Sequence, residues 1–413
     1  MSKIKIKNFG PIKAGCLDDD GWLDVKKVTV FIGNQGSGKS TVAKLITTFM
    51  WIEKAWTRGD YDKNWFADKD KLKNRFLKYF RLGDYFPKAD NAVIHFVGNS
   101  CRISFENRTL KIEDANNGVY DLPQIMYVPA ERNFTADVKN PRILKLTSES
   151  MVEFVGEFGK ALDELKGSLK LPVNDVDVEY NKQFDTVYIK GKVKGEPYKI
   201  NLSDASSGFQ SLVPLYLVSW HLANMVKGQG DGRSELMTSD QRERFRKQIQ
   251  VIMGNDDLTD EQKRIAISEE AKRFNKTAFI NIVEEPEQNL FPTAQWQILK
   301  SLLEFNNMNE GNKLIMTTHS PYLINYLTLA VKAATLAPLI KNDELKQRLC
   351  EIVPTRSVVN PEDLAVYEMD EIDGTIKKLA TYHGLPSDEN ELNLKLGESN
   401  ELFAQLLEIQ QAL

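Results

Sequence analysis

The stretch GNQGSGKST, which follows the apolar run VTVFI at residues 28–32, has the residue types that bind phosphate. It fits the pattern G-x-x-x-x-G-K-[ST], with Gly33 and Gly38 as the fixed glycines and Gly36 as a third. The glycines let such a loop curl so that its backbone N–H groups point at phosphate oxygens, and a helix that opens at Ser40 adds its dipole. The candidate phosphate-binding residues are therefore Gly33, Asn34, Gln35, Gly36, Ser37, Gly38, Lys39, Ser40 and Thr41.

Three carboxylates follow a second apolar run, AFINIV at residues 278–283, in the sequence EEPE. A phosphate loop that hydrolyses a nucleotide needs a second strand that ends in an acid for the metal, followed by a group that polarises the attacking water. Glu284 stands at the metal position, together with the hydroxyl of Ser40, and Glu285 stands at the general-base position. A solvated turn after a strand is the alternative, and the phosphate loop favours the site.

Two further stretches could contact the same phosphates. KLIMTTHSP at residues 313–321 is a predicted strand that ends in His319, where a sensor of the γ-phosphate would sit, although most isolated histidines are ordinary turn residues. SSGFQSL at residues 206–212 opens a predicted helix with small side chains, and such N-termini bind phosphate. A Ser/Gly helix cap would have the same sequence, so this stretch alone decides nothing.

The order of these motifs resembles the ABC-type ATPases of the SMC/RecF-like branch. The resemblance rests on GNQGSGKST, SSGFQ, the apolar strand followed by EEPE, and TTHSP. It implies ATP and Mg²⁺ as cofactors, with slow ATP hydrolysis as the activity. It also implies Lys39, Glu285 and His319 as catalytic residues and Ser40 and Glu284 as metal ligands.

SSGFQ looks like the LSGGQ signature of that family. Ser207, Gly208 and Gln210 match it, and Phe209 replaces the second glycine. In the family geometry the signature reaches the nucleotide of the other subunit, so the resemblance implies a homodimer that encloses two ATP molecules, with a higher oligomer left open. YVPAERN at residues 127–133 stands at the position of the Q-loop, but the usual glutamine is absent.

Within this branch, the chain resembles stand-alone prokaryotic ATPases of anti-phage and toxin–antitoxin-like systems. The resemblance rests on the motifs YVPAER and EEPEQNLFP and on the absence of coiled-coil arms. Relatives of these ATPases in the overcoming-lysogenisation class carry a TOPRIM nuclease after the ATPase head. The acids of VYEMDEIDG at residues 366–374 lack the TOPRIM pattern and fit a terminal strand and turn. The resemblance therefore implies a molecular switch that controls a separate effector protein, a nuclease or a toxin.

Composition limits the alternatives. The chain has 413 residues and a net charge of −4, so no global basic field points to nucleic acid or a membrane. Three scattered cysteines argue against a disulfide framework and favour a reducing cytoplasm. The N-terminal segment lacks the apolar core of a signal peptide, and the run at residues 212–226 is too short to span a bilayer. We expect a cytoplasmic protein without a membrane partner.

The periodicity places the motifs in an α/β fold. Beyond Thr277 strand and helix patterns alternate, which indicates crossover connections and a parallel sheet. With the resemblance, we expect a three-layer ABC-type head with a mixed sheet, an antiparallel β subdomain near residues 174–202 and a helical subdomain bearing SSGFQ. The expected organisation is a single head over residues 1–413, with an aromatic and basic insertion with a β segment at 51–125, a helical insertion at 135–175, a charged helical insertion at 228–276 and a C-terminal extension at 327–413.

Two segments leave alternatives open. Residues 51–90 contain ten Lys/Arg and ten aromatic residues, an interleaving that can stack bases and neutralise phosphates in a DNA-binding repair ATPase of the RecF/SMC type. The same segment could pack its aromatics inward. The acidic tail at 386–413 could dock a partner or pack on its own head. The energising subunit of a transporter is disfavoured, because such subunits are shorter and need a clear Q-loop.

Overall fold

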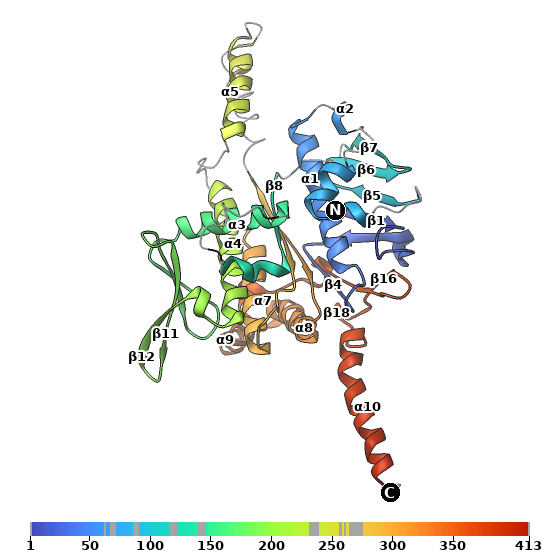
Figure 1. The fold of residues 1–413 in the computed structure, drawn as a ribbon, viewed down its shortest axis with the longest axis vertical. Helices are drawn as coiled ribbons and strands as arrows, with labels where there is room; N and C mark the ends of the chain where they lie inside the picture. Colours follow the sequence, from blue (N-terminus) through green and yellow to red (C-terminus); the bar gives the residue numbers. More distant parts are fainter. Residues whose placement is uncertain are drawn as a thin grey trace.

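The computed structural model describes residues 2–61, 63–66, 72–85, 91–115, 120, 122–136, 138, 146, 148–230, 239–255, 258–259, 262–263 and 276–411. Their strands form three sheets and a small two-stranded ribbon, with helices packed between and around them (Figure 1).

A mixed seven-stranded sheet forms the centre of the molecule. It contains β2 (Gly15–Cys16), β4 (Val28–Gly33), β8 (Pro123–Val128), β13 (Ala278–Glu284), β14 (Lys313–Thr317), β15 (Leu364–Met369) and β16 (Thr375–Lys378). The order is β2-β16-β15-β4-β14-β13-β8, and the five strands from β15 to β8 are parallel. β4, β8 and β13 are buried along their whole length, as strands covered on both faces must be.

A hydrophobic core lies on each face of this sheet, and helices pack against the sheet through these cores to form a layer on each side. Successive side chains of a strand point to opposite faces, so Phe31 joins one core, whereas Val30 and Ile32 join the other. On the Phe31 side lies α1 (Lys39–Arg58), and on the other side lie α4 (Ser207–Gly230), α7 (Pro292–Asn306) and α8 (Pro321–Leu336). The predicted α/β fold with a mixed sheet between helical layers is confirmed (Figure 1).

A five-stranded antiparallel sheet covers the outer side of α1. Its order is β3-β1-β5-β6-β7. The strands are β1 (Ser2–Lys7), β3 (Trp22–Val25), β5 (Val93–Val97), β6 (Cys101–Glu106) and β7 (Thr109–Asp114). Isoleucines 4 and 6 of β1 alternate with exposed or half-buried lysines, so only one face of this sheet is apolar.

The antiparallel β subdomain that the strand patterns near residues 174–202 predict is present, and it lies beside α3 (Glu149–Asp163) and α4. It has the order β12-β11-β10-β9, with β9 (Ser168–Lys170), β10 (Asp177–Asn181), β11 (Thr186–Val193) and β12 (Glu196–Asn201). Of the charged insertion expected at 228–276, the structure describes the end of α4 and α5 (Ser239–Met253), and most of its second helical segment lies outside the described residues.

The segment at 51–90 packs its aromatic rings together. Apart from the end of α1, its described elements are α2 (Lys63–Phe66) and the single turns η2 (Leu72–Leu77) and η3 (Gly83–Tyr85). Tyr61 stacks on Trp65 with ring centroids 3.9 Å apart, and Trp65 contacts Phe66 and Phe76 edge-on. Phe66 and Phe76 are buried in the core around α1. The packing alternative therefore accounts for these rings.

The C-terminal part returns to the centre before it leaves the molecule. β15 pairs with β4, so residues 364–378 of the expected extension complete the central sheet. The ribbon β17 (Thr381–Tyr382) and β18 (Leu385–Pro386) leads to α10 (Glu391–Gln411), which projects away from the body of the molecule (Figure 1). Every residue of α10 from 400 to 411 is exposed, so this part of the tail does not pack on its own head.

The remaining helices are short. They are η1 (Asp19–Gly21), η4 (Ala130–Ala136), η5 (Leu202–Asp204), η6 (Ala337–Leu339), α9 (Asp343–Ile352), η7 (Thr355–Ser357) and η8 (Pro361–Asp363). In the described part of the chain, one helix, Pro321–Leu339, is long and apolar enough to cross a membrane by length and composition alone. Leu323, Ile324 and Leu327 of this helix pack in the protein core.

Candidate functional site

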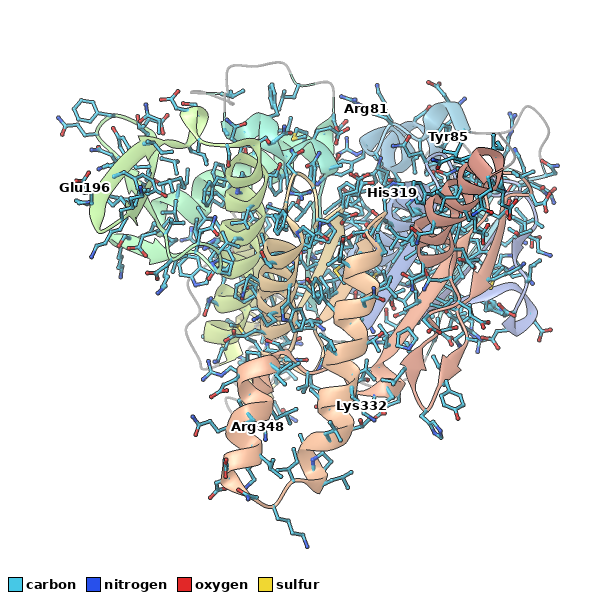
Figure 2. The ribbon with its side chains drawn as sticks, turned by 90° about the horizontal axis from the view of Figure 1, so that it is seen from below. Arg81, Tyr85, Glu196, His319, Lys332 and Arg348 are labelled. Carbon is cyan, nitrogen blue, oxygen red and sulfur yellow. The ribbon has the colours of Figure 1, made fainter. Side chains whose placement is uncertain are left out.

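The phosphate loop, the acidic loop and His319 meet at one edge of the central sheet. β4, β14, β13 and β8 are parallel, so their carboxyl ends lie side by side, which is where open α/β sheets bind ligands. β4 ends at Gly33, β13 ends at Glu284 in register with Thr317 of β14, and His319 follows β14. Figure 2 shows His319 near the middle of the molecule.

The glycines of the phosphate loop adopt conformations that other residues avoid. Gly33, Gly36 and Gly38 have φ values of 137°, 82° and 99°. A Cβ on Gly33 would collide with the carbonyl oxygen of Met369 on the neighbouring β15. The loop therefore curls tightly against the sheet and then opens into α1.

The ammonium group of Lys39 lies inside this loop. Its Nζ donates to the carbonyls of Gly33 at 2.8 Å and Asn34 at 2.7 Å. Burial lowers the pKa of Lys39 to about 8, against the opposing pull of the carboxylates of Glu285 and Glu287. A third contact, to the hydroxyl oxygen of Ser37 at 3.5 Å, is longer, so the buried cation has neutral oxygen partners and no close carboxylate among the described residues.

The other residues of the loop hold its shape. The hydroxyl of Ser37 donates to the carbonyl of Asn34 at 2.8 Å, and the side-chain oxygen of Asn34 accepts from the amide of Gln35. The Nδ2 atom of Asn34 donates to Oε1 of Glu371 at 2.7 Å, in the turn that follows β15. The loop is thus bonded to the C-terminal part of the chain.

Glu284 and Ser40 are suitable ligands for Mg²⁺. Glu284 is buried, and its Oε2 accepts from the amide of Ala130 at 3.3 Å. Among the described residues its Oε1 has no hydrogen-bond partner, and it lies 3.9 Å from Nζ of Lys44. Ser40 stands half-buried in the first turn of α1, followed by the buried Thr41. A buried unpartnered carboxylate oxygen and a hydroxyl are the hard oxygen donors that Mg²⁺ prefers, and Mg²⁺ commonly uses only one or two protein ligands beside phosphates.

Glu285 and His319 face each other across the site. Nε2 of His319 lies 3.5 Å from Oε1 of Glu285, and both side chains are partly exposed. Glu285 has a φ of 44°, and its amide donates to the carbonyl of Thr317 at 2.9 Å. Burial, and then the charge of Glu284, raises the pKa of the Glu285 carboxyl. Burial, and then the charge of Lys39, lowers the pKa of His319. Both shifts favour a neutral imidazole beside a carboxyl with increased basicity.

Arg132 is a residue of this site that the motif analysis does not assign. It is 1% exposed, and among the described residues its side chain donates only to main-chain carbonyls. Nη1 reaches Glu284 at 2.7 Å and Pro129 at 3.3 Å, Nη2 reaches Glu285 at 2.7 Å, and Nε reaches Ser211 of α4 at 3.0 Å. The signal was the arginine in YVPAERN, the stretch at the Q-loop position.

Glu287 is a second unassigned residue, the third carboxylate of EEPE. Its Oε1 accepts from the hydroxyl of Thr318 at 2.7 Å and from the amide of His319 at 2.8 Å. Its Oε2 is buried without a partner, and burial raises the pKa of this carboxyl. Glu287 thus holds the backbone that carries His319.

The signature-like stretch packs beside the acidic loop of its own chain. A Cβ on Gly208 would lie 2.9 Å from the carbonyl oxygen of Asn289, and Nδ2 of Asn289 donates to Oγ of Ser211 at 3.1 Å. Ser207 is exposed at the first position of α4. Nε2 of Gln210 donates to the carbonyls of residues 203 and 205, so it holds the turn before the helix. No contact between these residues and the phosphate loop is found in the described part of this single chain.

The model of the AAA ATPase domain family matches residues 1–155 and 261–324, together just over half of the chain. A curated relative, the cell division ATP-binding protein FtsE of Bacillus subtilis (strain 168), is 29% identical over 83 residues. That alignment covers 20% of this chain and 34% of the relative, so the chain spans about a third of the length of the relative that it matches.

Solved structures that the chain resembles include SMC heads and an ATP-binding cassette. The SMC head domain from Thermotoga maritima has a TM-score of 0.35 and 11% identity, covering 92% of this chain and 98% of that one. The Smc head from Pyrococcus furiosus, bound to the C-terminal domain of ScpA, has a TM-score of 0.33 and 11% identity, covering 98% and 100%. A dimeric ATP-binding cassette bound to ADP and Pi has a TM-score of 0.29 and 12% identity, covering 92% and 100%.

Proposed function

This chain belongs to the AAA ATPase domain family, and we propose that it is an ATP-driven molecular switch that dimerises around ATP and controls a separate effector protein. The observation that carries the switch is the position of α10. Its base is bonded to β15, the strand beside the one that leads into the phosphate loop. Its body projects from the molecule (Figure 1), and the large apolar side chains along it are exposed.

The ATPase part of the proposal assigns one task to each residue of the site. Lys39 releases the carbonyls of the loop and binds phosphate oxygens, with the backbone N–H groups of the loop around it. Glu285 accepts the proton of the attacking water, and the raised pKa of its carboxyl suits this task. His319 faces the same water and the terminal phosphate. Mg²⁺, when bound through Ser40 and Glu284, supplies positive charge to the phosphates.

The base of α10 is linked to the phosphate loop through β15 and the turn after it. The amide of Glu391, its first residue, donates to Oε1 of Glu368 on β15 at 2.6 Å. Glu371, in the next turn, accepts from Asn34 of the phosphate loop. The carboxylates of Glu391 and Glu371 also act on the charge of Lys39. A bound triphosphate brings negative charge toward these carboxylates, so binding changes the electrostatic balance at the base of the helix.

The body of α10 has the composition of a docking helix. The seven large apolar side chains from Leu394 to Ile409 are each between 42% and 64% exposed, so the helix presents several exposed apolar residues along its length and not a single one. Charged residues around them, mostly glutamates, suit a partner with an apolar groove and a basic rim. The exposed apolar residues are Leu394, Leu396, Leu402, Phe403, Leu406, Leu407 and Ile409.

We propose a nuclease or a toxin as the effector, in a cytoplasmic anti-phage or toxin–antitoxin-like system. The basis is the resemblance of YVPAER and EEPEQNLFP to stand-alone ATPases of such systems. In this proposal the chain supplies ATP binding and hydrolysis, and the partner supplies the second chemistry. A DNA-binding repair ATPase is the alternative, and the packing of the aromatic rings at 51–90 gives it no support.

Co-expression with the products of the neighbouring genes tests this function. The variant Leu402→Ser/Phe403→Ser/Leu406→Ser should lose a partner that the wild type retains, while ATP hydrolysis by the isolated chain stays unchanged. Val251→Ser/Met253→Ser is a matched control, because these side chains are also exposed and apolar but lie on α5. A complex that survives the α10 variant, or that the α5 control also abolishes, would contradict α10 as the docking helix.

A further inference from the structure

Arg132 joins three parts of the site through carbonyls alone. Its guanidinium bonds the end of β13 at Glu284 and Glu285, the turn after β8 at Pro129, and the first turns of α4 at Ser211. A fully buried cation is costly to desolvate, and burial lowers the pKa of Arg132 to about 10. If Arg132 only filled space, an apolar residue could replace it at little cost in stability. Its guanidinium instead donates to carbonyls of three segments, which points to a role in positioning them.

Ser211, in the first turns of α4, is held at two atoms by residues from outside its own helix. Its carbonyl accepts from Nε of Arg132 at 3.0 Å, and its hydroxyl oxygen accepts from Nδ2 of Asn289 at 3.1 Å. Pro214 follows in the same helix and has no N–H group, so the carbonyl of Gln210, four residues earlier, lacks its donor within the helix. The turn that starts at Ser207 is therefore bonded through Ser211 to Arg132 and to the acidic loop.

The same fork fixes the peptide that carries the proposed base. Glu285 has a φ of 44°, in the left-handed region that side chains disfavour. Arg132 binds the carbonyls on both sides of this residue's amide and Cα, those of Glu284 and Glu285. A change in the position of α4 therefore reaches the backbone of Glu285 through one side chain.

We propose that Arg132 is a positioning residue that couples Glu285 to the first turn of α4. The inference rests on the proposed function, in which Glu285 acts on the ATP of its own chain and Ser207 contacts the ATP of the second copy. Within one chain, Arg132 then links Glu285, which acts on the ATP of that chain, to the turn at Ser207, which contacts the ATP of the other chain. These two parts move as a unit, so a change at one ATP site of the dimer is transmitted to the other.

Steady-state ATP hydrolysis by the full chain with ATP and Mg²⁺ tests the coupling. Arg132→Lys keeps the charge and loses the fork, so kcat should fall about 10-fold or more, while the Kd for ATP changes less than about 2-fold, since the loop around Lys39 is untouched. Cooperativity in ATP concentration, if the wild type shows it, should disappear. Arg132→Lys with wild-type kcat would overturn the proposal.

Asn289→Ala separates coupling from mere stability. It removes the second link to Ser211 and leaves Arg132, Lys39 and Glu285 unchanged, so kcat should fall while the Kd for ATP changes less than about 2-fold. Asn289 is exposed, so the melting temperature of this variant should stay close to that of the wild type. Unchanged kcat in Asn289→Ala would refute the coupling even if Arg132 variants fail to fold. A wild-type chain that hydrolyses no ATP would instead refute the proposed function.

Discussion

Nε2 of His319 lies 3.5 Å from Oε1 of Glu285, at the carboxyl ends of two neighbouring parallel strands. Their backbones are also linked, because the amide of Glu285 donates to the carbonyl of Thr317. The imidazole and the carboxylate thus occupy the same small region beside Lys39. A water between them and a terminal phosphate would meet a proton acceptor and a neutral ring at once, which is the arrangement that hydrolysis requires.

Lys39 and Glu285 should separate ATP binding from ATP turnover. Lys39→Ala removes the buried cation, so both the affinity for ATP and the turnover should fall. Glu285→Gln keeps the shape and removes the base, so turnover should fall about 100-fold or more while ATP stays bound. Filter binding of labelled ATP and a phosphate-release assay measure the two effects. Wild-type turnover in Glu285→Gln would exclude Glu285 as the base.

The affinity for ATP should fall as the pH rises above about 8. Burial lowers the pKa of Lys39 to about 8, so the empty loop loses the ammonium charge in a range where an exposed lysine keeps it. Bound phosphates favour the charged form, so binding near pH 9 takes up a proton and weakens with rising pH. Calorimetry in two buffers of different ionisation enthalpy, at about pH 7.5 and pH 9, measures both effects. Equal affinity and no proton uptake at the two pH values would contradict a titrating Lys39.

Glu287 should matter through the backbone of His319. Glu287→Ala removes the acceptor of two hydrogen bonds, so the free energy of unfolding should fall by about 1–3 kcal/mol. The rate of ATP turnover should fall as well. Glu287→Gln keeps an acceptor oxygen for both donors, so its turnover should lie nearer the wild type. Thermal denaturation and kcat of both variants measure this. If Ala and Gln variants hydrolyse ATP equally well, Glu287 does not position His319.

The pH dependence of stability gives Glu287 a second test. Burial raises the pKa of the Glu287 carboxyl in the folded chain above its pKa in the unfolded chain. The folded chain therefore binds the proton more tightly, which adds stability at a pH below the unfolded-state pKa. This added stability is lost as the pH rises through the folded-state pKa. Glu287→Gln lacks this loss. Its stability relative to the wild type should therefore increase from about pH 4 to pH 8, and a difference that does not change with pH would contradict the raised pKa.

Binding of duplex DNA should be weak and should not depend on the segment at 51–90. Arg58 is paired with Asp60, and aromatic rings of the same segment, those of Tyr61, Trp65 and Phe76, pack on one another. Lys69, which a phosphate track in this segment would need, lies outside the described residues, as do the side-chain positions of Lys63. Replacing Lys54, Arg58, Lys63, Lys69 and Lys73 by Ser should leave the salt dependence of binding unchanged. A clearly flatter slope of affinity against salt in that variant would favour the repair ATPase.

The fold could be predicted where the periodicity was strong. The strand–helix alternation after Thr277 and the strand patterns near 174–202 correspond to observed strands and helices. The packing of the aromatic segment at 51–90 could not be chosen over nucleic-acid binding from its composition, because both need the same interleaved rings and charges; its described rings contact one another and Trp51 of α1. The pairing of β15 with β4 could not be predicted, since a short strand far along the chain has no local signal for its partner.

The site could be predicted as far as its motifs extend. Lys39, Glu284, Glu285 and His319 lie at one sheet edge because each follows a strand of the same parallel set. Arg132 bonds only carbonyls, and its partners come from three segments, so no spacing in the sequence indicates its role. Glu371 and Glu391 act on the charge of Lys39 only because the C-terminal part of the chain returns to the phosphate loop. Nothing in the sequence near these two residues indicates that return.

The closing of two chains around ATP is the central claim, and the solution mass of Glu285→Gln tests it most directly. Light scattering should give one fixed mass without nucleotide and twice that mass with ATP and Mg²⁺, because each Ser207 would then contact the ATP held by the Lys39 of the other copy. Adding Lys39→Ala or Ser207→Arg to this background should prevent the increase. A mass that ATP leaves unchanged, in a Glu285→Gln chain shown to hold ATP, would contradict the dimer and the switch built on it.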